Sequence, residues 1–191
     1  MKKIIILASA FLLSTAAIAQ TTWKNDPMHS KLGFTVTHLM VSDVDGIFTN
    51  FTCTITAAKP DFSDATFNLT VNTASINTDV EYRDKDLKSA NYFDVDKYPT
   101  MTFTSTGIAP VSTNHYKLSG NLTLHGVTKA VTMDLWYRGT ITNPMSKKDD
   151  AGFKLTGTIK RSDFNFASQA GSTMLSDEIT INANGEFGKV N

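Results

Sequence analysis

Polar and apolar residues alternate along most of this 191-residue chain, and that pattern constrains the fold more than any single residue does. Phe67, Leu69 and Val71, for example, are separated by Asn68 and Thr70. Successive side chains of a β-strand point to opposite faces, so a period of two predicts strands with one apolar and one polar face. The pattern predicts about eight strands, in segments 31–38, 46–56, 66–72, 100–104, 116–124, 131–137, 153–159 and 179–187.

The predicted strands are typical of an antiparallel sheet. Parallel strands would be apolar on both faces and joined by long helical crossovers, and neither pattern is present in the sequence. Phe48 breaks the alternation of segment 46–56, which predicts a bulge there, and bulges help a sheet to curl closed. We therefore predict an all-β protein with one domain over residues 20–191, folded as a single eight-stranded antiparallel barrel.

One polar segment interrupts the strands. Thr78 followed by Glu81 three residues later fits a capping box, and Asp79 adds negative charge at the positive end of a helix dipole. Lys85 and Lys88 follow in the later turns, where cations are favoured. These features predict one short helix around residues 79–90, laid across an end or edge of the barrel.

The first 19 residues have the pattern of an export signal. Lys2 and Lys3 precede an apolar run over residues 4–13, and Ala17-Ile18-Ala19 has the small-x-small form of a cleavage site. We expect cleavage between Ala19 and Gln20 and a periplasmic or secreted mature protein. The apolar run is too short for a membrane span, and no later stretch reaches that length.

Charge and cysteine content argue against a nucleic-acid-binding protein and against a disulfide-stabilised one. Without Lys2 and Lys3 the chain has 16 basic and 18 acidic residues, and no basic run remains, so we expect no nucleic-acid partner. Cys53 is the single cysteine, so no internal disulfide can form. We expect Cys53 to be a small buried apolar residue rather than a reactive thiol.

The order of several short motifs resembles the YceI-like family of exported lipocalin-like barrels, from Trp23 to about Phe187. The most specific stretch is Ser75-Ile76-Asn77-Thr78, Arg83-Asp84-x-x-Leu87-x-Ser89, Phe93-Asp94 and Tyr98-Pro99-x-Met101-x-Phe103. Further matches are Gly120 to Lys129 and Arg161-Ser162-Asp163-Phe164, although Asn165 stands where many members have Gly. The resemblance implies an eight-stranded antiparallel barrel that binds amphiphiles with isoprenoid tails, such as quinones or polyprenyl phosphates.

The inward face of such a barrel is either a packed core or a pocket for one small ligand. Periodicity alone favours a filled core, whereas the resemblance favours a pocket. Burial stabilises by about 0.8 kcal/mol per methylene, so a chain of isoprene units would readily leave water for this interior. The expected ligand-binding residues are Phe34, Val36, His38, Phe51, Phe67, Leu69, Phe103, Leu122, Leu124, Met133, Leu135, Phe153, Arg83 and Asp84.

Arg83 and Asp84 have two interpretations. A guanidinium at the barrel mouth could pair with a pyrophosphate or hydrogen-bond a quinone carbonyl. Alternatively, Arg83 could form a structural ion pair with Asp84 or Asp86 that ties the helix to a barrel loop, and the residues alone favour this second interpretation.

The four histidines do not have the spacing of a metal site. His29, His38, His115 and His125 are separated by 9, 77 and 10 residues, whereas zinc sites usually contain a closer pair of ligands. The carboxylates are scattered, and there is no Gly-x-Ser-x-Gly elbow. We therefore expect no metal site, no catalytic residues and no cofactor other than a bound isoprenoid lipid.

The sequence thus predicts a binding or carrier protein, not an enzyme, which buries an isoprenoid tail along the barrel axis and leaves the head group at an open end. Two alternatives remain open. One is an enzyme that acts on such a lipid or quinone through Arg83, Asp84 and a histidine, and the other is a structural or stress-protective module with a filled barrel. Homodimer formation also remains open, since no seam in the sequence commits to it.

Overall fold

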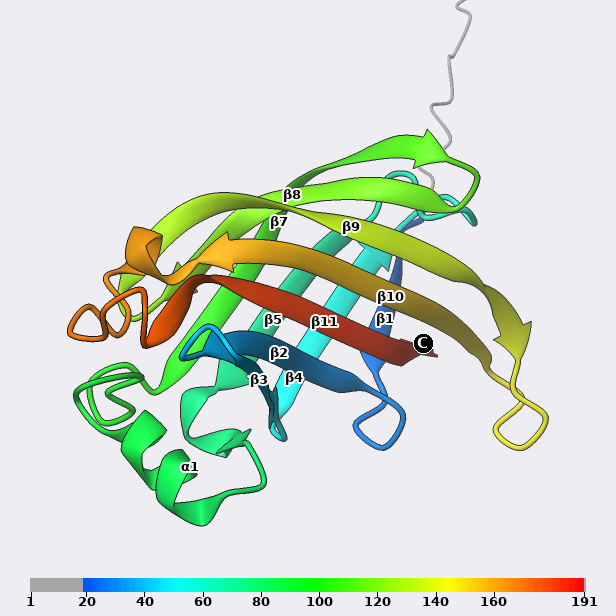
Figure 1. Cartoon of the computed structure of the whole chain (residues 1–191). Helices are drawn as coiled ribbons and strands as arrows, with labels where there is room; N and C mark the ends of the chain where they lie inside the picture. Colours follow the sequence, from blue (N-terminus) through cyan, green and yellow to red (C-terminus); the bar gives the residue numbers. More distant parts are fainter. Residues whose placement is uncertain (1–18, 191) are drawn as a thin grey trace, which may run out of the picture.

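The structure is a computed structural model that describes residues 19–190, and most of these residues are in β-strands (Figure 1). The expected export signal lies almost wholly outside the described residues. The strands are β1 (Thr21–Asn25), β2 (Lys31–His38), β3 (Ser42–Phe48), β4 (Phe51–Ala57), β5 (Thr66–Asn72), β6 (Ile76–Asn77), β7 (Thr100–Ser112), β8 (His115–Leu124), β9 (Val127–Thr142), β10 (Asp149–Lys160) and β11 (Leu175–Val190).

All strands belong to one antiparallel sheet that closes on itself. The order β1-β4-β5-β7-β8-β9-β10-β11 returns to β1 through a β1–β11 pairing, while β2, β3 and β6 continue the sheet from β11. β11 pairs with β2 along its first part and with β1 at its end, so β1 and β2 occupy one position in the barrel. In the same way, β3 and β4 together form one strand of the barrel and β5 and β6 form the next, since β4 pairs with β5 and β3 pairs with β6. The predicted eight-stranded antiparallel barrel is confirmed.

The irregularity predicted near Phe48 lies at the junction of β3 and β4. Phe48 and Cys53 are both buried although they have opposite parity, so the chain shifts by one residue at Thr49-Asn50. There the Thr49 N–H donates to the carbonyl of Ser75 at 3.1 Å, outside the regular ladder. The interruption turns the strand while its inward face stays apolar.

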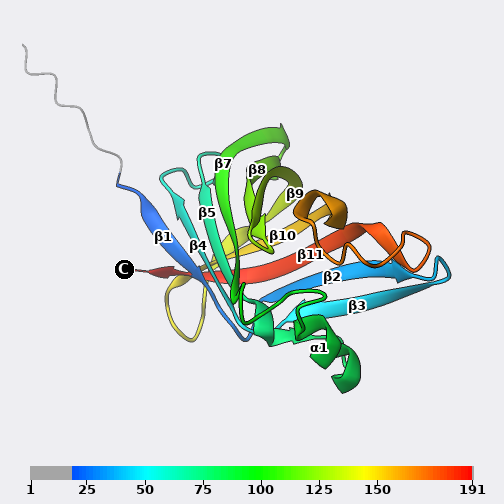
Figure 2. The ribbon, with the colours of Figure 1, turned by 90° about the vertical axis from the view of Figure 1, so that its left-hand side faces the viewer.

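The predicted helix is present as α1 (Glu81–Lys88), outside the barrel beneath β2 and β3 (Figure 2). The predicted capping box is wrong. The N-cap residue is Val80, which makes no side-chain cap bond, because the left-handed conformation of Asp79 (φ 60°) separates Thr78 from the first turn. Two short 3-10 segments are also present, η1 (Thr73–Ser75) and η2 (Arg161–Phe164).

Candidate functional site

The barrel encloses an apolar cavity of about 150 Å³. It is surrounded by inward-facing side chains from opposite walls of the barrel, so it lies inside the barrel rather than on its outer surface. Lining residues from the expected ligand-binding set are Phe34, Phe51, Phe67, Leu69, Phe103, Leu122, Met133, Leu135 and Phe153. Lining residues that the sequence did not single out include Met101, Leu118, Val131, Leu155, Ile159 and Ile181.

One end of the interior is packed solid with aromatic rings. Phe62, from the loop between β4 and β5, is 2% exposed, and its ring centroid lies 4.9 Å from that of Tyr137 and 5.0 Å from that of Phe153. Trp23 packs on the same ring at 5.3 Å. We call this part of the interior, around Trp23, Phe62, Tyr137 and Phe153, the filled half. It forms the floor of the cavity and closes that end of the barrel.

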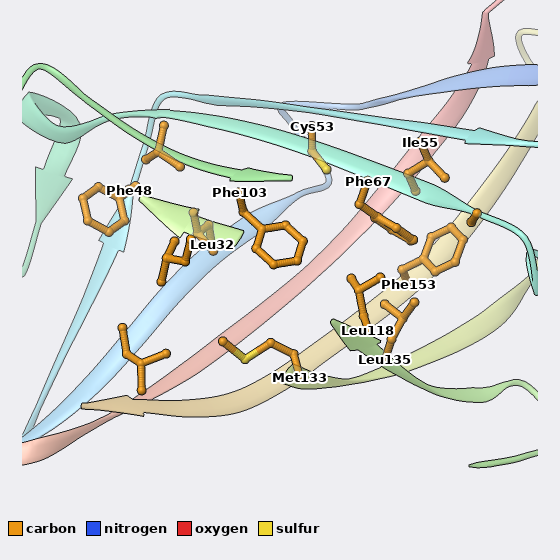
Figure 3. Packing of buried hydrophobic residues seen from close by; sticks show 14 of the residues in the cluster. Leu32, Phe48, Cys53, Ile55, Phe67, Phe103, Leu118, Met133, Leu135 and Phe153 are labelled. Atoms are coloured by element: carbon orange, nitrogen blue, oxygen red, sulfur yellow. The ribbon is translucent and has the colours of Figure 1, made fainter. Parts of the chain in front are cut away.

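The cavity lies in the remaining part, which we call the hollow half and define by Leu69, Phe103, Val131, Met133, Leu155 and Ile181. Figure 3 shows Ile55, Phe67, Leu118, Leu135 and Phe153 gathered at one end of the view, with Phe103 and Met133 further along. Most residues of the hollow half point inward and yet are only partly buried, because they face the cavity.

Three inward-facing glycines keep the hollow half open. A Cβ atom at Gly157 would lie 2.0 Å from Met133 Sδ, and one at Gly120 would lie 2.3 Å from Phe103 Cζ. A Cβ at Gly46 would meet the ring of Phe34 in the same way. These side chains therefore lie directly on the barrel wall above a glycine, which leaves the axis free.

A pair of aromatic rings packs at the end of the interior opposite the filled half. Phe93, from the segment after α1, contacts Phe48 of the cavity lining at 5.6 Å between ring centroids. Phe166, from the loop that follows η2, packs on Phe93 at 4.6 Å. We call Phe93 and Phe166 the aromatic lid. Figure 1 shows both parent segments at the same end of the barrel as α1.

The loop that bears Phe166 is organised by a buried arginine, which the sequence analysis did not single out. Arg161 is 6% exposed, and its guanidinium donates to the carbonyl oxygens of Ala167 and Ala170 at 2.7 Å each. Further bonds reach the carbonyls of Phe166, Leu175 and Ser176. Arg161 was visible only as part of the family motif, since its partners are backbone atoms that leave no sequence signal.

Arg83 and Asp84 both bond to one threonine. The Thr78 N–H and hydroxyl donate to Asp84 Oδ1 at 2.8 and 2.6 Å, while Arg83 donates to the Thr78 hydroxyl and carbonyl at 2.8 Å each. These bonds fix the start of α1 to the chain that leaves β6. The geometry favours a structural role, through Thr78 rather than through the expected ion pair, and neither residue lines the cavity.

Three more expected ligand-binding residues lie away from the cavity lining. Val36 and Leu124 are buried beyond it, toward the aromatic lid. His38 is exposed at the end of β2, where the strand leaves the barrel. Alternation assigned these side chains to the inward face, but it does not indicate where along the barrel axis the cavity ends.

Cys53 lines the cavity and is buried, as expected. Removal from water raises the pKa of its thiol to about 12, because burial penalises the thiolate. The side chain thus behaves as a small apolar group.

No helix among the described residues is long and apolar enough to cross a membrane.

Comparison with protein families matches residues 23–187 to the model of the YceI-like domain. Among curated proteins, a UPF0312 protein of Staphylococcus aureus strain USA300 is 36% identical over 171 residues, which cover 87% of this chain and 97% of the relative.

Solved structures share the fold. A YceI protein of Campylobacter jejuni superposes with a TM-score of 0.75 at 33% identity, covering 81% of this chain and 90% of that one. BcnA of Burkholderia cenocepacia gives 0.73 at 24% identity, with coverages of 85% and 98%. A polyisoprenoid binding domain from Saccharophagus degradans gives 0.65 at 14% identity, covering 87% of this chain and 97% of that domain.

Proposed function

The chain belongs to the YceI-like family, and we propose that it binds the tail of an isoprenoid-type lipid in the hollow half of its barrel. The observation that carries this proposal is an apolar cavity in a barrel whose other half is packed solid. The polyisoprenoid binding domain among the structural neighbours supports the same ligand class.

The size of the cavity limits how a tail can enter. An engineered apolar cavity of about 150 Å³ takes up benzene, so the cavity here has room for roughly one isoprene unit as it stands. Each five-carbon unit that leaves water would stabilise the complex by roughly 4 kcal/mol. A longer tail therefore needs side chains of the lining to move apart, and it enters past the aromatic lid because the filled half closes the other end.

The tail is proposed to belong to a quinone or a polyprenyl phosphate, with its head group at the lid end. The export signal expected from the sequence supports a further proposal, that the protein holds or carries this lipid through the periplasm. Tail burial requires shape and apolar area and no chemical step.

The lining favours binding over catalysis. Among the described residues around the cavity, ionisable or nucleophilic side chains are those of Ser30, Lys31 and Cys53. The pKa of Cys53 is raised to about 12, which removes the thiolate that a nucleophile needs. Apart from the Asn184 amide, the rest of the lining offers apolar contact, as a tail-binding site requires.

The test is native mass spectrometry of the protein purified from its own source, followed by organic extraction of whatever is bound. We expect a one-to-one adduct with the mass spacing of an isoprenoid series. The Gly157→Ala variant should lose most of this adduct, because the added methyl forces Met133 into the cavity. Gly107→Ala is the matched control, since a Cβ there meets nothing within 4 Å.

A protein that carries no lipid and also refuses added quinones and polyprenyl phosphates would overturn the proposal. Equal adduct in Gly157→Ala and Gly107→Ala would place the lipid elsewhere on the molecule. Turnover of a bound lipid would establish the enzymatic alternative.

A further inference from the structure

A second group of chemically active side chains lies where the barrel wall is interrupted. Between β1 and β2 the segment from Asp26 to Ser30 leaves the sheet and lies against Glu186 of β11. The Asp26 N–H donates to the Glu186 carbonyl at 2.8 Å, and the Ser30 hydroxyl donates to the same oxygen at 3.3 Å. Both ends of the segment are therefore held at one position of β11.

This anchoring brings one imidazole and two carboxylates together. His29 Nδ1 lies 2.8 Å from Asp26 Oδ2, and the ligand atoms of Asp26, His29 and Glu186 all lie within 4.8 Å of one another. The sequence analysis expected no such cluster, because Glu186 is more than 150 positions away along the chain. Only the β1–β2 interruption and the register of β11 bring it to His29.

A third acidic group faces the same place from the neighbouring strand. Asp150 of β10 lies diagonally across the ladder from Glu186, since Gly152 pairs with Glu186 and Asp150 pairs with Gly188. The side chains of Glu186 and Asp150 are both half-buried. Two carboxylates in such proximity repel each other unless a proton or a cation lies between them.

The nearby cationic side chains do not neutralise this pair. Within residues 19–190 the ion pairs are His29–Asp26 and Lys117–Asp134, so neither Glu186 nor Asp150 has a basic partner within 4.0 Å. Arg138 borders the same cleft, but its guanidinium lies over the ring of Trp136 at 5.4 Å. The cleft has a volume of about 460 Å³ and is open to solvent.

We propose that Asp26, His29 and Glu186 bind one divalent transition-metal ion, with Zn²⁺ as the expected occupant and Asp150 as the fourth ligand. One imidazole with carboxylates is a donor set that suits Zn²⁺, whereas Ca²⁺ and Mg²⁺ prefer oxygen ligands alone. Tetrahedral zinc bonds of about 2.0–2.2 Å place the ligand atoms roughly 3.4 Å apart. The 2.8 Å pair of His29 and Asp26 would therefore open slightly, while the wider pairs, up to 4.8 Å, would close. His29 is exposed and the carboxylates are partly buried, so their side chains are free to make this movement.

The bound ion would stabilise the barrel wall at the point where the sheet is interrupted between β1 and β2. It would join the segment between β1 and β2 to β11 and β10, where the regular ladder is missing. The cleft and the apolar cavity share Phe153, Asn184 and Gly185, so the ion would lie beside the cavity and outside it. This inference concerns the wall of the barrel and does not depend on the proposed lipid.

The test is isothermal titration of the metal-free full chain with ZnCl₂ in a buffer that does not bind metal, with no lipid present. We expect one ion per chain, and Ca²⁺ should give little heat. His29→Ala and Glu186→Gln should each weaken Zn²⁺ binding by about tenfold or more, because each removes one ligand. His115→Ala is the matched control, since that imidazole stacks on Trp136 on the outer wall.

Thermal unfolding gives a second readout. A hundredfold excess of Zn²⁺ over its Kd should raise the Tm by roughly 5–10 °C in the wild type and in His115→Ala, but not in His29→Ala. Circular dichroism establishes that the variants are folded. Absence of binding at millimolar Zn²⁺, or equal binding by His29→Ala and the wild type, would overturn the proposal. Because no lipid is used, either result leaves the tail-binding proposal to its own test.

Discussion

The filled half and the hollow half of this barrel arise from the same strands and the same alternation, yet one is a packed core and the other is a cavity. In the filled half, Phe62 enters from a loop and occupies the axis, and three aromatic rings close around it. In the hollow half no large loop side chain of residues 19–190 lines the cavity, and glycines allow the largest side chains to lie on the wall. A two-residue period therefore decides which residues face inward, and the filling of the interior depends on loops and glycines.

The two halves of the interior also have different roles, one in stability and the other in ligand contact. In the filled half each large apolar side chain is closely packed, and it therefore contributes more to the free energy of unfolding than one beside a void. The hollow half forgoes part of that stability and keeps apolar surface available for a ligand. Substitutions in the two halves should thus differ in cost even when the chemistry of the change is identical.

The largest effect is expected when the filled half loses its central ring. Phe62→Ala should lower the free energy of unfolding by about 3–5 kcal/mol, because it leaves a cavity among Trp23, Tyr137 and Phe153. Urea unfolding followed by fluorescence measures the change. Val111→Ala serves as the control, since Val111 is exposed on β7 and should shift the value by less than about 0.5 kcal/mol. A loss of under 1 kcal/mol for Phe62→Ala would mean that the filled half is not the stabilising half.

A matched pair of leucines tests the comparison with identical chemistry. Leu118 is 0% exposed at the floor of the cavity, where it adjoins the filled half, whereas Leu155 is only partly buried in the lining of the hollow half. Leu118→Ala should cost about 3–5 kcal/mol and Leu155→Ala about 1–2 kcal/mol, since the second truncation enlarges an existing void and removes fewer contacts. Urea unfolding of both variants provides the two values. Equal costs would show that the hollow half is packed in solution.

At the lid end, Arg83→Ala should have a smaller effect. It removes two hydrogen bonds to Thr78 beside α1, so we expect a loss of about 1–2 kcal/mol in the free energy of unfolding. Binding of a tail without a charged head group, such as a prenyl alcohol, should stay within about twofold of the wild type. A selective loss of affinity for a polyprenyl phosphate, with the prenyl alcohol unaffected, would instead assign Arg83 to the head group.

Much of the fold could be predicted from the sequence, because alternation and turn residues act locally. The other strand segments, their antiparallel arrangement, the short helix and an irregularity near Phe48 follow from neighbours within a few positions, whereas β1 was not predicted. The Thr78–Glu81 capping box was wrong because the chain turns at Asp79, where the Thr78 hydroxyl bonds to Asp84 instead of capping the helix. A spacing of three residues does not reveal that turn.

The candidate site was predictable only in part. Nine of the expected side chains line the cavity, because the inward face can be assigned strand by strand. Arg161 and the Asp26–His29–Glu186 cluster depend on contacts between segments far apart in the sequence, and the partners of Arg161 are backbone carbonyls. Neither arrangement has a periodic signature.

The hollow half also contains a reporter in Cys53. Burial raises the pKa of its thiol to about 12 from 9.0, so at pH 8 the folded protein should hold about a thousandfold less thiolate than the unfolded chain. Reaction with a disulfide reagent should therefore be slow in the native state and fast in denaturant, and an added prenyl lipid should slow it further. A native rate close to that of the unfolded chain would mean that the hollow half opens readily to water.

The same shift makes stability depend on pH. A thiol whose pKa is higher in the folded state than in the unfolded state lowers stability as the pH rises above the unfolded value, because only the unfolded chain releases its proton easily. Between pH 9 and pH 10 the free energy of unfolding should fall by about 1 kcal/mol in the wild type. Cys53→Ala should be less stable at pH 8 but should lack this decline. Parallel curves for the two proteins across that range would show that the thiol meets water in the folded state, and the cavity would then be a wet channel rather than a dry site for a tail.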